Sequence, residues 1–404
     1  MIQVAVLGYG TVGSGVVEVI ENNNSSVSVK AGEEMHVKYI LDLRDFPGDA
    51  YEDRVVHDFR VILEDEEIGV VCEVMGGVGA AYQYTKQALE AGKSVCTSNK
   101  ELVAKHGAEL LELARNNRCS YMFEASVGGG IPIIRPINKA LTAERLENIS
   151  AILNGTTNYI LTKMEKEGAD YGETLKRAQE LGYAERDPAA DVEGYDACRK
   201  IAILSSLMVG KTVDAERIYT EGITGITPAD FAFARAAGMT IKLLAVSRVL
   251  EDDRVFAMVA PALLSKEHPL AVVNDVYNGV FVTGNMLGDV MFYGRGAGKL
   301  PTASAVVSDV IDCARHIGRS SIVCIWEREE AGLVKIGETE RAFFLRAAVG
   351  AREAVEKTFP GGRVLTVADR TEDFGYITPV MQEKVFEEKY AALGAGVLNR
   401  IRIA

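Results

Sequence analysis

The 404-residue sequence predicts an α/β protein that begins with a doubly wound parallel sheet, continues with an α+β region on a mixed sheet, and ends in a ferredoxin-like unit. Strand-like and helix-like segments alternate over residues 1–125, whereas four strand-like segments follow one another closely over 241–293. The segments within 342–403 have the order βαββαβ. Alternation favours parallel strands covered by helices, and closely spaced strands favour antiparallel or mixed pairing. The βαββαβ order is ferredoxin-like.

In the first region, the apolar run Ile2–Leu7 ends in glycines and leads into a segment, 11–22, whose apolar residues have helical spacing. Further strand-like segments lie at 36–43, 69–74, 94–97 and 120–123, and further helix-like segments at 80–91 and 102–116. This alternation is typical of a Rossmann-type sheet with helices on both faces.

The middle region has a strand-like segment at 149–153 and helix-like segments at 156–167, 174–181, 194–209 and 228–237. Strand-like segments then follow at 241–249, 254–261, 280–283 and 289–293, before a helix-like segment at 302–318 that we expect to return to the first domain. We therefore expect three domains, which comprise residues 1–130 with about 298–320, residues 131–297, and residues 325–404.

Composition excludes several classes of protein. Lys and Arg number 44 against 57 Asp and Glu, a net charge of −13 with no basic cluster, so we expect no nucleic-acid partner. No apolar stretch approaches the ~20 residues that cross a bilayer, and no basic segment of a signal peptide precedes the first strand. The six cysteines form no C-x-x-C, so we expect neither a zinc ribbon nor disulfides, and a cytoplasmic location.

The sequence Gly8-Tyr9-Gly10-Thr11-Val12-Gly13 has the pattern G-x-G-x-x-G between a strand and a helix. Gly8 allows the tight turn, Gly10 lets a pyrophosphate approach the backbone, and Gly13 lets helix and strand pack closely. Thr11 and Val12 open the helix, whose free N–H groups and partial positive charge favour phosphates. The motif predicts a dinucleotide cofactor.

The end of the second strand carries two conflicting indications of cofactor type. An acid there, Asp42 or Asp45, would accept a hydrogen bond from the ribose 2′-hydroxyl of NAD, whereas Arg44 would pair with the 2′-phosphate of NADP. We expect NADP with some use of NAD. The alternative is that Arg44 is an ordinary solvated charge.

Two further loops follow strand ends in the first region. Lys100 lies at the carboxyl edge of the sheet, where it would serve the cofactor or a substrate carboxylate, or else be a surface lysine. Glu124 precedes the glycine-rich segment 125–132. One carboxylate with backbone carbonyls suits a hard monovalent cation, although the same composition would also suit a hinge.

The densest polar cluster spans residues 182–196 and precedes a helix that contains Lys200. Asp196 and Lys200 are four residues apart, so they share one helical face. Glu185, Asp191 and Asp196 could surround the ammonium group of an amino acid while Lys200 reaches a reacting oxygen. The alternative is that acids gather at a helix start because the dipole favours them, with a plain surface ion pair.

Taken together, these segments resemble homoserine dehydrogenases. The resemblance covers roughly residues 1–320, is most specific at 182–200, and rests on segments that occur in the family's order: 8–13, 98–100, 124–132, 154–161, 182–200 and 294–303. It implies reversible NAD(P)-dependent oxidation of L-homoserine to L-aspartate 4-semialdehyde, a step toward threonine and methionine. It also implies a homodimer or homotetramer with the central sheet at the interface.

The resemblance also implies roles for individual residues. Lys200 corresponds to the family's proton-transfer lysine, Glu185 and Asp196 to its homoserine-binding acids, and Asp191 to the same pocket. Lys100 corresponds to a lysine that contacts the cofactor. The positions that hold a sodium ion in the family correspond to Glu124, Val127, Gly129 and Ile131. The positions at the nicotinamide end of the cofactor correspond to Gly182 and Gly298.

The C-terminal unit departs from the expected pattern. Enzymes of this kind often end in an ACT domain, whose effector site usually has an acidic residue and a Pro-Gly in the first strand-to-helix turn. That turn is Gly350-Ala351-Arg352-Glu353 here. The sequence therefore predicts an ACT-like fold and leaves threonine regulation open.

Three alternative functions compete with this prediction. An aspartate-semialdehyde dehydrogenase needs an activated cysteine, and no cysteine here has an evident base partner; Cys198 falls on a different helical face from Asp196 and Lys200. Another NAD(P)-dependent dehydrogenase of a small amino or hydroxy acid remains open. A nucleotide sensor without turnover would leave the cluster at 182–200 without a purpose.

Overall fold

The computed structural model describes residues 1–321 and 324–404, which form two compact units. Unit 1 comprises Met1–Arg145, Ala202–Asp214 and the described part of Gly294–Ala331. Unit 2 comprises Leu146–Ile201, Ala215–Tyr293 and Gly332–Ala404. The finer division into three domains stays a prediction.

Unit 1 contains a six-stranded parallel sheet in the order β3-β2-β1-β4-β5-β6. Its strands are β1 (Ile2–Leu7), β2 (Met35–Leu41), β3 (Val55–Val56), β4 (Ile68–Glu73), β5 (Ser94–Thr97) and β6 (Tyr121–Met122). The chain runs outward from β1 in one direction and then, from β4, in the other. This confirms the predicted doubly wound sheet, with its switch point beside β1, where such sheets bind ligands.

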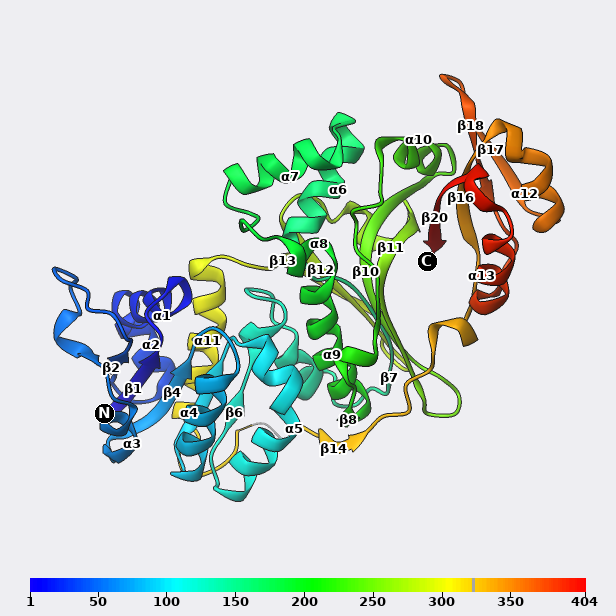
Figure 1. Ribbon diagram of the computed structural model, residues 1–404. Helices are drawn as coiled ribbons and strands as arrows, with labels where there is room; N and C mark the ends of the chain where they lie inside the picture. Colours follow the sequence, from blue (N-terminus) through cyan, green and yellow to red (C-terminus); the bar gives the residue numbers. More distant parts are fainter. Residues whose placement is uncertain (322–323) are drawn as a thin grey trace. The chain divides into compact units, whose positions relative to one another are not determined.

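The helices of unit 1 cover this sheet (Figure 1). They are α1 (Thr11–Asn22), α2 (Asn24–Ala31), α3 (Phe59–Glu64), α4 (Gly79–Glu90), α5 (Lys100–Asn116) and α11 (Lys299–Ala314). Helix α11 packs beside α1, where Val16 and Val17 share a core with Val306 and Val310. The return of this late helix to the first sheet was predicted from sequence. Unit 1 also contains the two-stranded pair β8 (Lys211–Thr212) and β14 (Glu327–Glu330).

Three local expectations differ from the structure. Helix α11 begins before Pro301, because proline is tolerated in the first turn of a helix, where its missing N–H leaves no bond unmade. Helices α2 and α3 were not predicted, since each buries only two residues and so has little apolar periodicity. Strand β12 (Tyr277–Gly284) begins three residues before the strand-like segment 280–283 that the sequence predicts.

Unit 2 is built on a ten-stranded mixed sheet that runs β13-β12-β7-β10-β11-β20-β16-β18-β17, with β9 beside β11. Its central strands are β7 (Leu146–Ile152), β9 (Tyr219–Thr220), β10 (Met239–Val249), β11 (Val255–Ser265), β12 (Tyr277–Gly284) and β13 (Gly288–Arg295). The predicted mixed sheet is therefore present, and β10 pairs with β11 in antiparallel register along its whole length.

The C-terminal elements have the predicted βαββαβ order. They are β16 (Phe343–Ala348), α12 (Arg352–Thr358), β17 (Arg363–Val367), β18 (Arg370–Ile377), α13 (Glu383–Ala391) and β20 (Val397–Ile403), accompanied by the short pair β15 (Glu340–Arg341) and β19 (Met381–Gln382). The strands lie antiparallel in the order β20-β16-β18-β17, as in a ferredoxin-like unit. The last strand, β20, also pairs in parallel with β11 at Ala262↔Arg402 and Leu263↔Ile403, so the C-terminal strands continue the central sheet.

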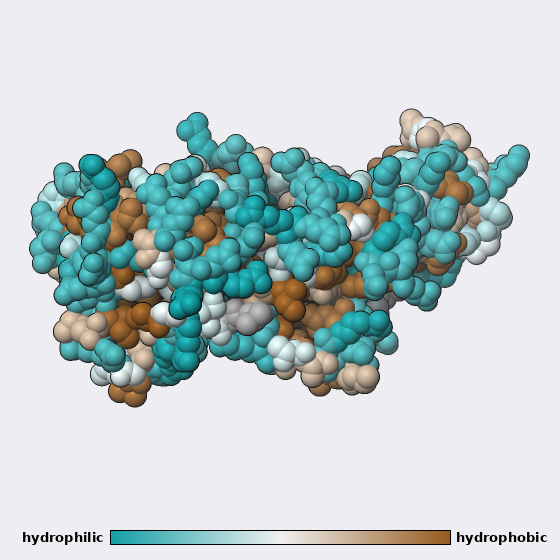
Figure 2. Space-filling model, turned by 90° about the horizontal axis from the view of Figure 1, so that it is seen from below, coloured by the Kyte–Doolittle hydropathy of each residue, from teal (hydrophilic) through white to brown (hydrophobic). Residues whose placement is uncertain are grey.

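The remaining helices of unit 2 are α6 (Gly155–Glu167), α7 (Tyr171–Glu180), α8 (Ala189–Val192) and α10 (Pro228–Ala236), and α9 (Tyr195–Val209) crosses the division between the units. No helix within the described residues is both long and apolar enough to span a bilayer. On the face seen in Figure 2, hydrophilic residues cover most of the surface and hydrophobic residues are gathered in separate patches. All six cysteines lie within the described residues, are buried and form no disulfide.

Candidate active site

The glycine loop of unit 1 has the geometry that a bound pyrophosphate requires. Gly8 has φ +96°, a conformation that favours glycine. A Cβ on Gly13 would stand 1.8 Å from the carbonyl oxygen of Gly8, whereas none of the described atoms lies within 4 Å of the Cβ position of Gly10. No acid stands in the first turn of α1 and no side chain of the described residues caps it. The loop at Gly8, Gly10, Thr11, Val12 and Gly13 therefore fits an anion at the helix N-terminus.

The end of β2 lies beside this loop. Asp42 accepts a hydrogen bond from the backbone N–H of Tyr9 at 2.8 Å and is bound by Arg44 through two guanidinium nitrogens at 3.0 Å each. Arg44 holds the pKa of Asp42 far below its usual range. Gly8, Gly10, Asp42, Arg44 and neighbouring residues line a pocket of about 460 Å³, a size usual for a ligand site. Asp42 and Arg44, which gave conflicting indications of cofactor type, thus line the same pocket and are hydrogen-bonded to each other.

A buried acid that sequence reasoning missed organises the carboxyl ends of β4 and β5. Glu73 accepts hydrogen bonds from the N–H of Met75 at 2.8 Å and from the hydroxyl of Thr97 at 2.7 Å. Thr97 in turn accepts from the N–H of Asn99, which caps α5 directly before Lys100. Burial raises the pKa of Glu73 to about 7. An acid at the end of an otherwise apolar strand was the available signal.

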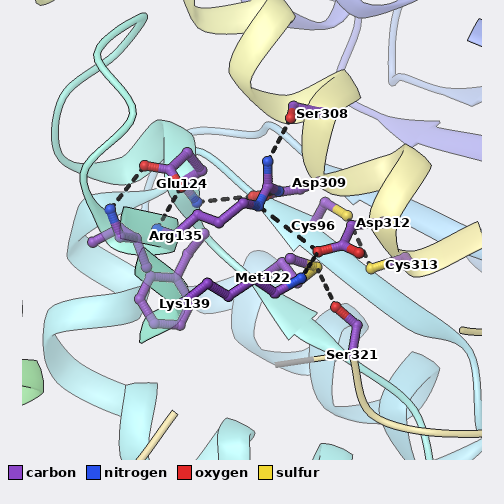
Figure 3. A network of polar contacts seen from close by, with 12 residues as sticks. Cys96, Met122, Glu124, Arg135, Lys139, Ser308, Asp309, Asp312, Cys313 and Ser321 are labelled. Carbon is purple, nitrogen blue, oxygen red and sulfur yellow. Dashed lines mark hydrogen bonds and ion pairs between the residues drawn. The ribbon is translucent and has the colours of Figure 1, made fainter. Parts of the chain in front are cut away.

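Glu124 is the centre of a buried polar network (Figure 3). Its carboxylate accepts backbone N–H groups of Ile133 at 2.5 Å, Ile134 at 2.8 Å and Arg135 at 2.7 Å, so it caps the turn that leads into residues 136–140. Its own N–H donates to Asp309 of α11 at 2.8 Å, and Asp309 also binds the guanidinium of Arg135. Three acceptor positions of Glu124, the predicted cation ligand, are therefore occupied by backbone N–H groups.

The loop after Glu124 packs against the second glycine cluster of unit 1. Gly129 has φ +58°, and a Cβ there would stand 2.2 Å from the carbonyl oxygen of Gly296. Val127 and Ile131 are fully buried in the same loop. Gly298, with φ +130°, begins α11 as its N-cap. The two clusters that the sequence treated separately are one packed junction of backbone.

In unit 2, the predicted lysine and two of the predicted acids come together. Lys200 donates to Asp196 at 2.7 Å and to the carbonyl oxygen of Leu153 at 2.8 Å. Asn154 donates from its single amide nitrogen to Asp191 at 2.7 Å and to Asp196 at 2.9 Å. Asp196 and Lys200 are buried, and burial followed by the nearby Asp196 charge raises the pKa of Asp191. The cluster is a desolvated lysine held by a carboxylate, not a surface ion pair.

Asn154 was not predicted as part of this cluster. It is the N-cap of α6, where its side-chain oxygen accepts the N–H of Thr157 at 2.9 Å, so one amide both caps the helix and bridges two acids. The signal was the Asn-Gly-Thr-Thr sequence, a typical helix start that also lay within the resemblance. Glu185 and Gly182 lie at exposed positions before α8, outside the buried cluster.

These features define a class of protein. Unit 1 has the doubly wound sheet and glycine loop of a dinucleotide-binding domain, and unit 2 buries a lysine bonded to a carboxylate, a group suited to moving a proton at a substrate oxygen. This combination is that of an NAD(P)-dependent dehydrogenase.

Comparison with known proteins identifies the family. Residues 8–124 match the family model "Homoserine dehydrogenase, NAD binding domain", and residues 132–311 match "Homoserine dehydrogenase". The chain is 46% identical over 316 residues to a homoserine dehydrogenase of Synechocystis sp., which covers 77% of this chain and 73% of that one. The chain belongs to the homoserine dehydrogenase family.

Solved structures agree with this assignment. A homoserine dehydrogenase from Thiobacillus denitrificans superposes with a TM-score of 0.90 at 33% identity, over 100% of this chain and 98% of that one. A hyperthermophilic archaeal homoserine dehydrogenase in complex with NADPH gives 0.65 at 29% identity, over 77% of this chain and 97% of that one. The reaction is accordingly the NAD(P)-dependent, reversible oxidation of L-homoserine to L-aspartate 4-semialdehyde.

Proposed function

We propose that Lys200 moves the proton of this reaction, and the single observation that supports this most is its buried bond to Asp196 beside Asn154 and Asp191. In the oxidation, the hydroxyl proton of homoserine passes to a neutral Lys200 amine as the C–O single bond becomes C=O. In the reduction, the charged ammonium returns that proton to the carbonyl oxygen. The bound nicotinamide supplies the hydride chemistry.

The acids assigned to the same pocket as Lys200 would bind the substrate. The two N–H groups of the Asn154 amide are donated to Asp191 and Asp196, which holds both carboxylates together as acceptors for the ammonium group of the amino-acid substrate. Glu185 is assigned to the same substrate from the family pattern, and its exposed position suits a residue that meets the substrate from the solvent side. On the nucleotide side, Lys100, Gly182 and Gly298 are assigned to the cofactor in the same way.

We propose that the chain accepts NADP and also uses NAD. The bidentate Arg44 neutralises Asp42, which lowers the repulsion that a 2′-phosphate would otherwise meet there. His57 lines the same pocket and donates to the carbonyl of Asp42 at 2.7 Å, a bond that raises the pKa of His57. Arg44 and His57 thus both line this pocket beside Asp42.

We propose a monovalent cation, sodium in the family pattern, at the loop of Val127, Gly129 and Ile131. Backbone carbonyls would supply most of the ligands, because three of the acceptor positions of Glu124 are taken by backbone N–H groups and only the Oε2 atom keeps a free one. Among the described residues, no three His, Cys, Asp or Glu side chains gather as a metal site. Activity measured in sodium and in tetramethylammonium buffers tests this proposal, and equal rates would contradict it.

We further propose that the chain forms a homodimer or homotetramer whose subunits contact one another through the central sheet of unit 2. We also propose that the enzyme acts in threonine and methionine biosynthesis, and that the C-terminal unit has an ACT-like role. One face of the sheet has a hollow of about 930 Å³ lined partly by apolar residues of β10 and β11, such as Leu244 and Phe256. Light scattering after size-exclusion chromatography measures the assembly, and a monomer at micromolar concentration would contradict it.

A steady-state assay with L-homoserine tests the proposed function directly. We expect homoserine-dependent reduction of both nucleotides, with the larger kcat/KM for NADP, and a rate that rises in alkaline buffer, where a proton is released more readily. Threonine added to the same assay shows whether the C-terminal unit is an effector domain. Absence of homoserine-dependent turnover with either nucleotide would overturn the proposal.

A further inference from the structure

The segment Tyr219–Ile223 of unit 2 lies between the last strand and the turn that carries the substrate acids. On one side, the N–H of Ile223 donates to the carbonyl oxygen of Val192 at 2.9 Å. A Cβ on Gly222 would stand 2.3 Å from that oxygen and 2.6 Å from the Cα of Glu193. Gly194 has φ +86°, and a Cβ there would stand 3.1 Å from the side-chain Cγ2 of Thr220. Backbone therefore meets backbone along the turn between Asp191 and Asp196.

On the other side, Glu221 is held by the last strand of the chain. Its Oε2 atom accepts from Arg402 of β20 at 2.5 Å and from Arg400 at 3.3 Å, and also from the hydroxyl of Tyr219 at 2.8 Å. Although burial opposes ionisation, these arginines hold the pKa of Glu221 below its usual range. Arg402 is itself only 1% exposed and also binds Glu383 at 2.6 Å.

We propose that Glu221 and Arg402 are positioning residues: the C-terminal strand holds the segment Tyr219–Ile223 against the substrate turn, so that homoserine affinity depends on the C-terminal unit. This inference rests on the proposed role of Asp191 and Asp196. The match to the homoserine dehydrogenase family ends at residue 311, so Arg402 lies outside the matched region.

The physical basis is that Arg402 is buried while its partner Glu221 is 30% exposed, so the arginine end of this ion pair has little freedom to relax. A guanidinium at 1% exposure must keep its carboxylate partners, since an unpaired buried charge is costly. The backbone of Gly222 likewise has no room to move toward Val192 without a clash. A displacement of β20 is therefore passed to the substrate turn through rigid contacts, and a small misplacement of a binding group weakens affinity strongly.

A matched pair of glycine substitutions tests the packed side. Gly222→Ala pushes the turn away, whereas Gly225→Ala, two residues beyond the end of the segment, meets none of the described atoms within 4 Å. We expect Gly222→Ala to raise the KM for homoserine on the order of tenfold, with the KM for nucleotide unchanged. We expect Gly225→Ala to resemble the wild type. Equal homoserine KM values for the two variants would overturn the proposal.

Substitutions of the ion pair test the C-terminal side. We expect Arg402→Gln and Glu221→Gln to raise the homoserine KM about threefold to tenfold with less than a twofold change in kcat, and Arg402→Lys to restore most of the affinity. Arg346→Lys is the control, because Arg346 of β16 joins the same C-terminal sheet to Asp230 of α10 at 2.7 Å but has no bond to the substrate turn. We expect it to lower the melting temperature and leave the homoserine KM unchanged.

Deuterium exchange of the full chain separates this inference from the assigned activity. Peptides over residues 190–200 should exchange faster in Arg402→Gln than in the wild type or in Arg346→Lys, whether or not homoserine is turned over. Unchanged exchange, or equal acceleration in both variants, would overturn the positioning role. Should Arg402→Gln not fold, Glu221→Gln, which leaves the Arg402–Glu383 bond in place, gives the same readout.

Discussion

The two candidate binding regions, one in each unit, differ in the groups that they offer to a ligand. In unit 1, the nucleotide loop works through backbone: glycines at 8, 10 and 13 and the bare N-terminus of α1. In unit 2, the proposed substrate cluster consists of side chains, with Asn154 bridging Asp191 and Asp196 beside Lys200. A site made of backbone groups can be recognised from a short stretch of sequence. A site made of side chains depends on segments that only folding brings together.

A second contrast sharpens this comparison. Glu124 and Asp196 are both buried acids, with exposed fractions of 3% and 4%. Glu124 is saturated largely by three backbone N–H groups, so its main work is to hold a turn. Asp196 instead holds a lysine and an amide, so its contacts place a group that can exchange a proton. The partner, more than the acid itself, decides which role a buried carboxylate takes.

The largest expected effect is that of Lys200→Ala. Removing the proton-transfer group should lower kcat by ~10²- to 10⁴-fold, the usual contribution of a positioned acid or base. Nucleotide binding, measured by the fluorescence of NADPH, should stay near the wild-type value because Lys200 lies in the substrate cluster of unit 2. A turnover number close to that of the wild type would remove Lys200 from the reaction.

The next effect contrasts two glycines of the nucleotide loop. Gly13→Ala places a Cβ 1.8 Å from the Gly8 carbonyl oxygen, so we expect a loss of stability of about 3 kcal/mol or more. Gly10→Ala meets none of the described atoms, so it should fold normally and weaken only nucleotide binding. Thermal unfolding with and without NADPH separates the two, and equal melting temperatures for both variants would contradict the packing argument.

Glu73 predicts a dependence of stability on pH. Its folded-state pKa of about 7 lies above its usual value of 4.5, so the folded chain holds an extra proton between these values. The stability that this group contributes is present below about pH 4.5 and is lost as pH rises through 7, by up to about 3 kcal/mol. Glu73→Gln should remove this slope in urea unfolding from pH 5 to 8. Glu90→Gln, at an exposed position of α4, should keep it.

Asn154 allows its two roles to be separated. Asn154→Ala removes both the cap of α6 and the bridge between Asp191 and Asp196, so it should lose about 1 kcal/mol of stability and on the order of tenfold in kcat/KM for homoserine. Asn154→Ser keeps a capping oxygen but loses the amide donor. We expect it to recover stability without recovering kcat/KM; recovery of both would show that the cap alone matters.

The smallest expected effect is that of Arg44→Ala. Because Arg44 is largely exposed, its loss should raise the KM for NADP only a few-fold and leave the KM for NAD nearly unchanged. Arg60→Ala is a suitable control, since Arg60 binds Asp58 with the same two-residue spacing but does not line the nucleotide pocket. An equal change in both KM values would show that Arg44 does not distinguish the cofactors.

Much of the fold could be predicted because its signals are local. The apolar run of β1, the glycine loop and the periodic helix α1 lie within 22 residues, and the structure has them where expected. The short helices α2 and α3 were not predicted, because they bury too few residues for their apolar positions to show helical spacing. The pairing of β20 with β11 brings together residues 402 and 262, and a contact between residues so far apart in the chain cannot be predicted from a local sequence pattern.

By itself, the sequence determined the doubly wound sheet and the glycine loop after its first strand, because turn geometry and helix start depend on residues close together in the chain. It also placed Asp196 and Lys200 on one helical face through their four-residue spacing, whereas the role proposed for Lys200 came from the family resemblance. Only the tertiary structure decided that Asn154 bridges Asp191 and Asp196, that Glu124 is bound by backbone N–H groups, and that Arg402 binds Glu221. These decisions depend on burial. Once water is excluded, each charge must find a partner from whatever segment the fold places beside it.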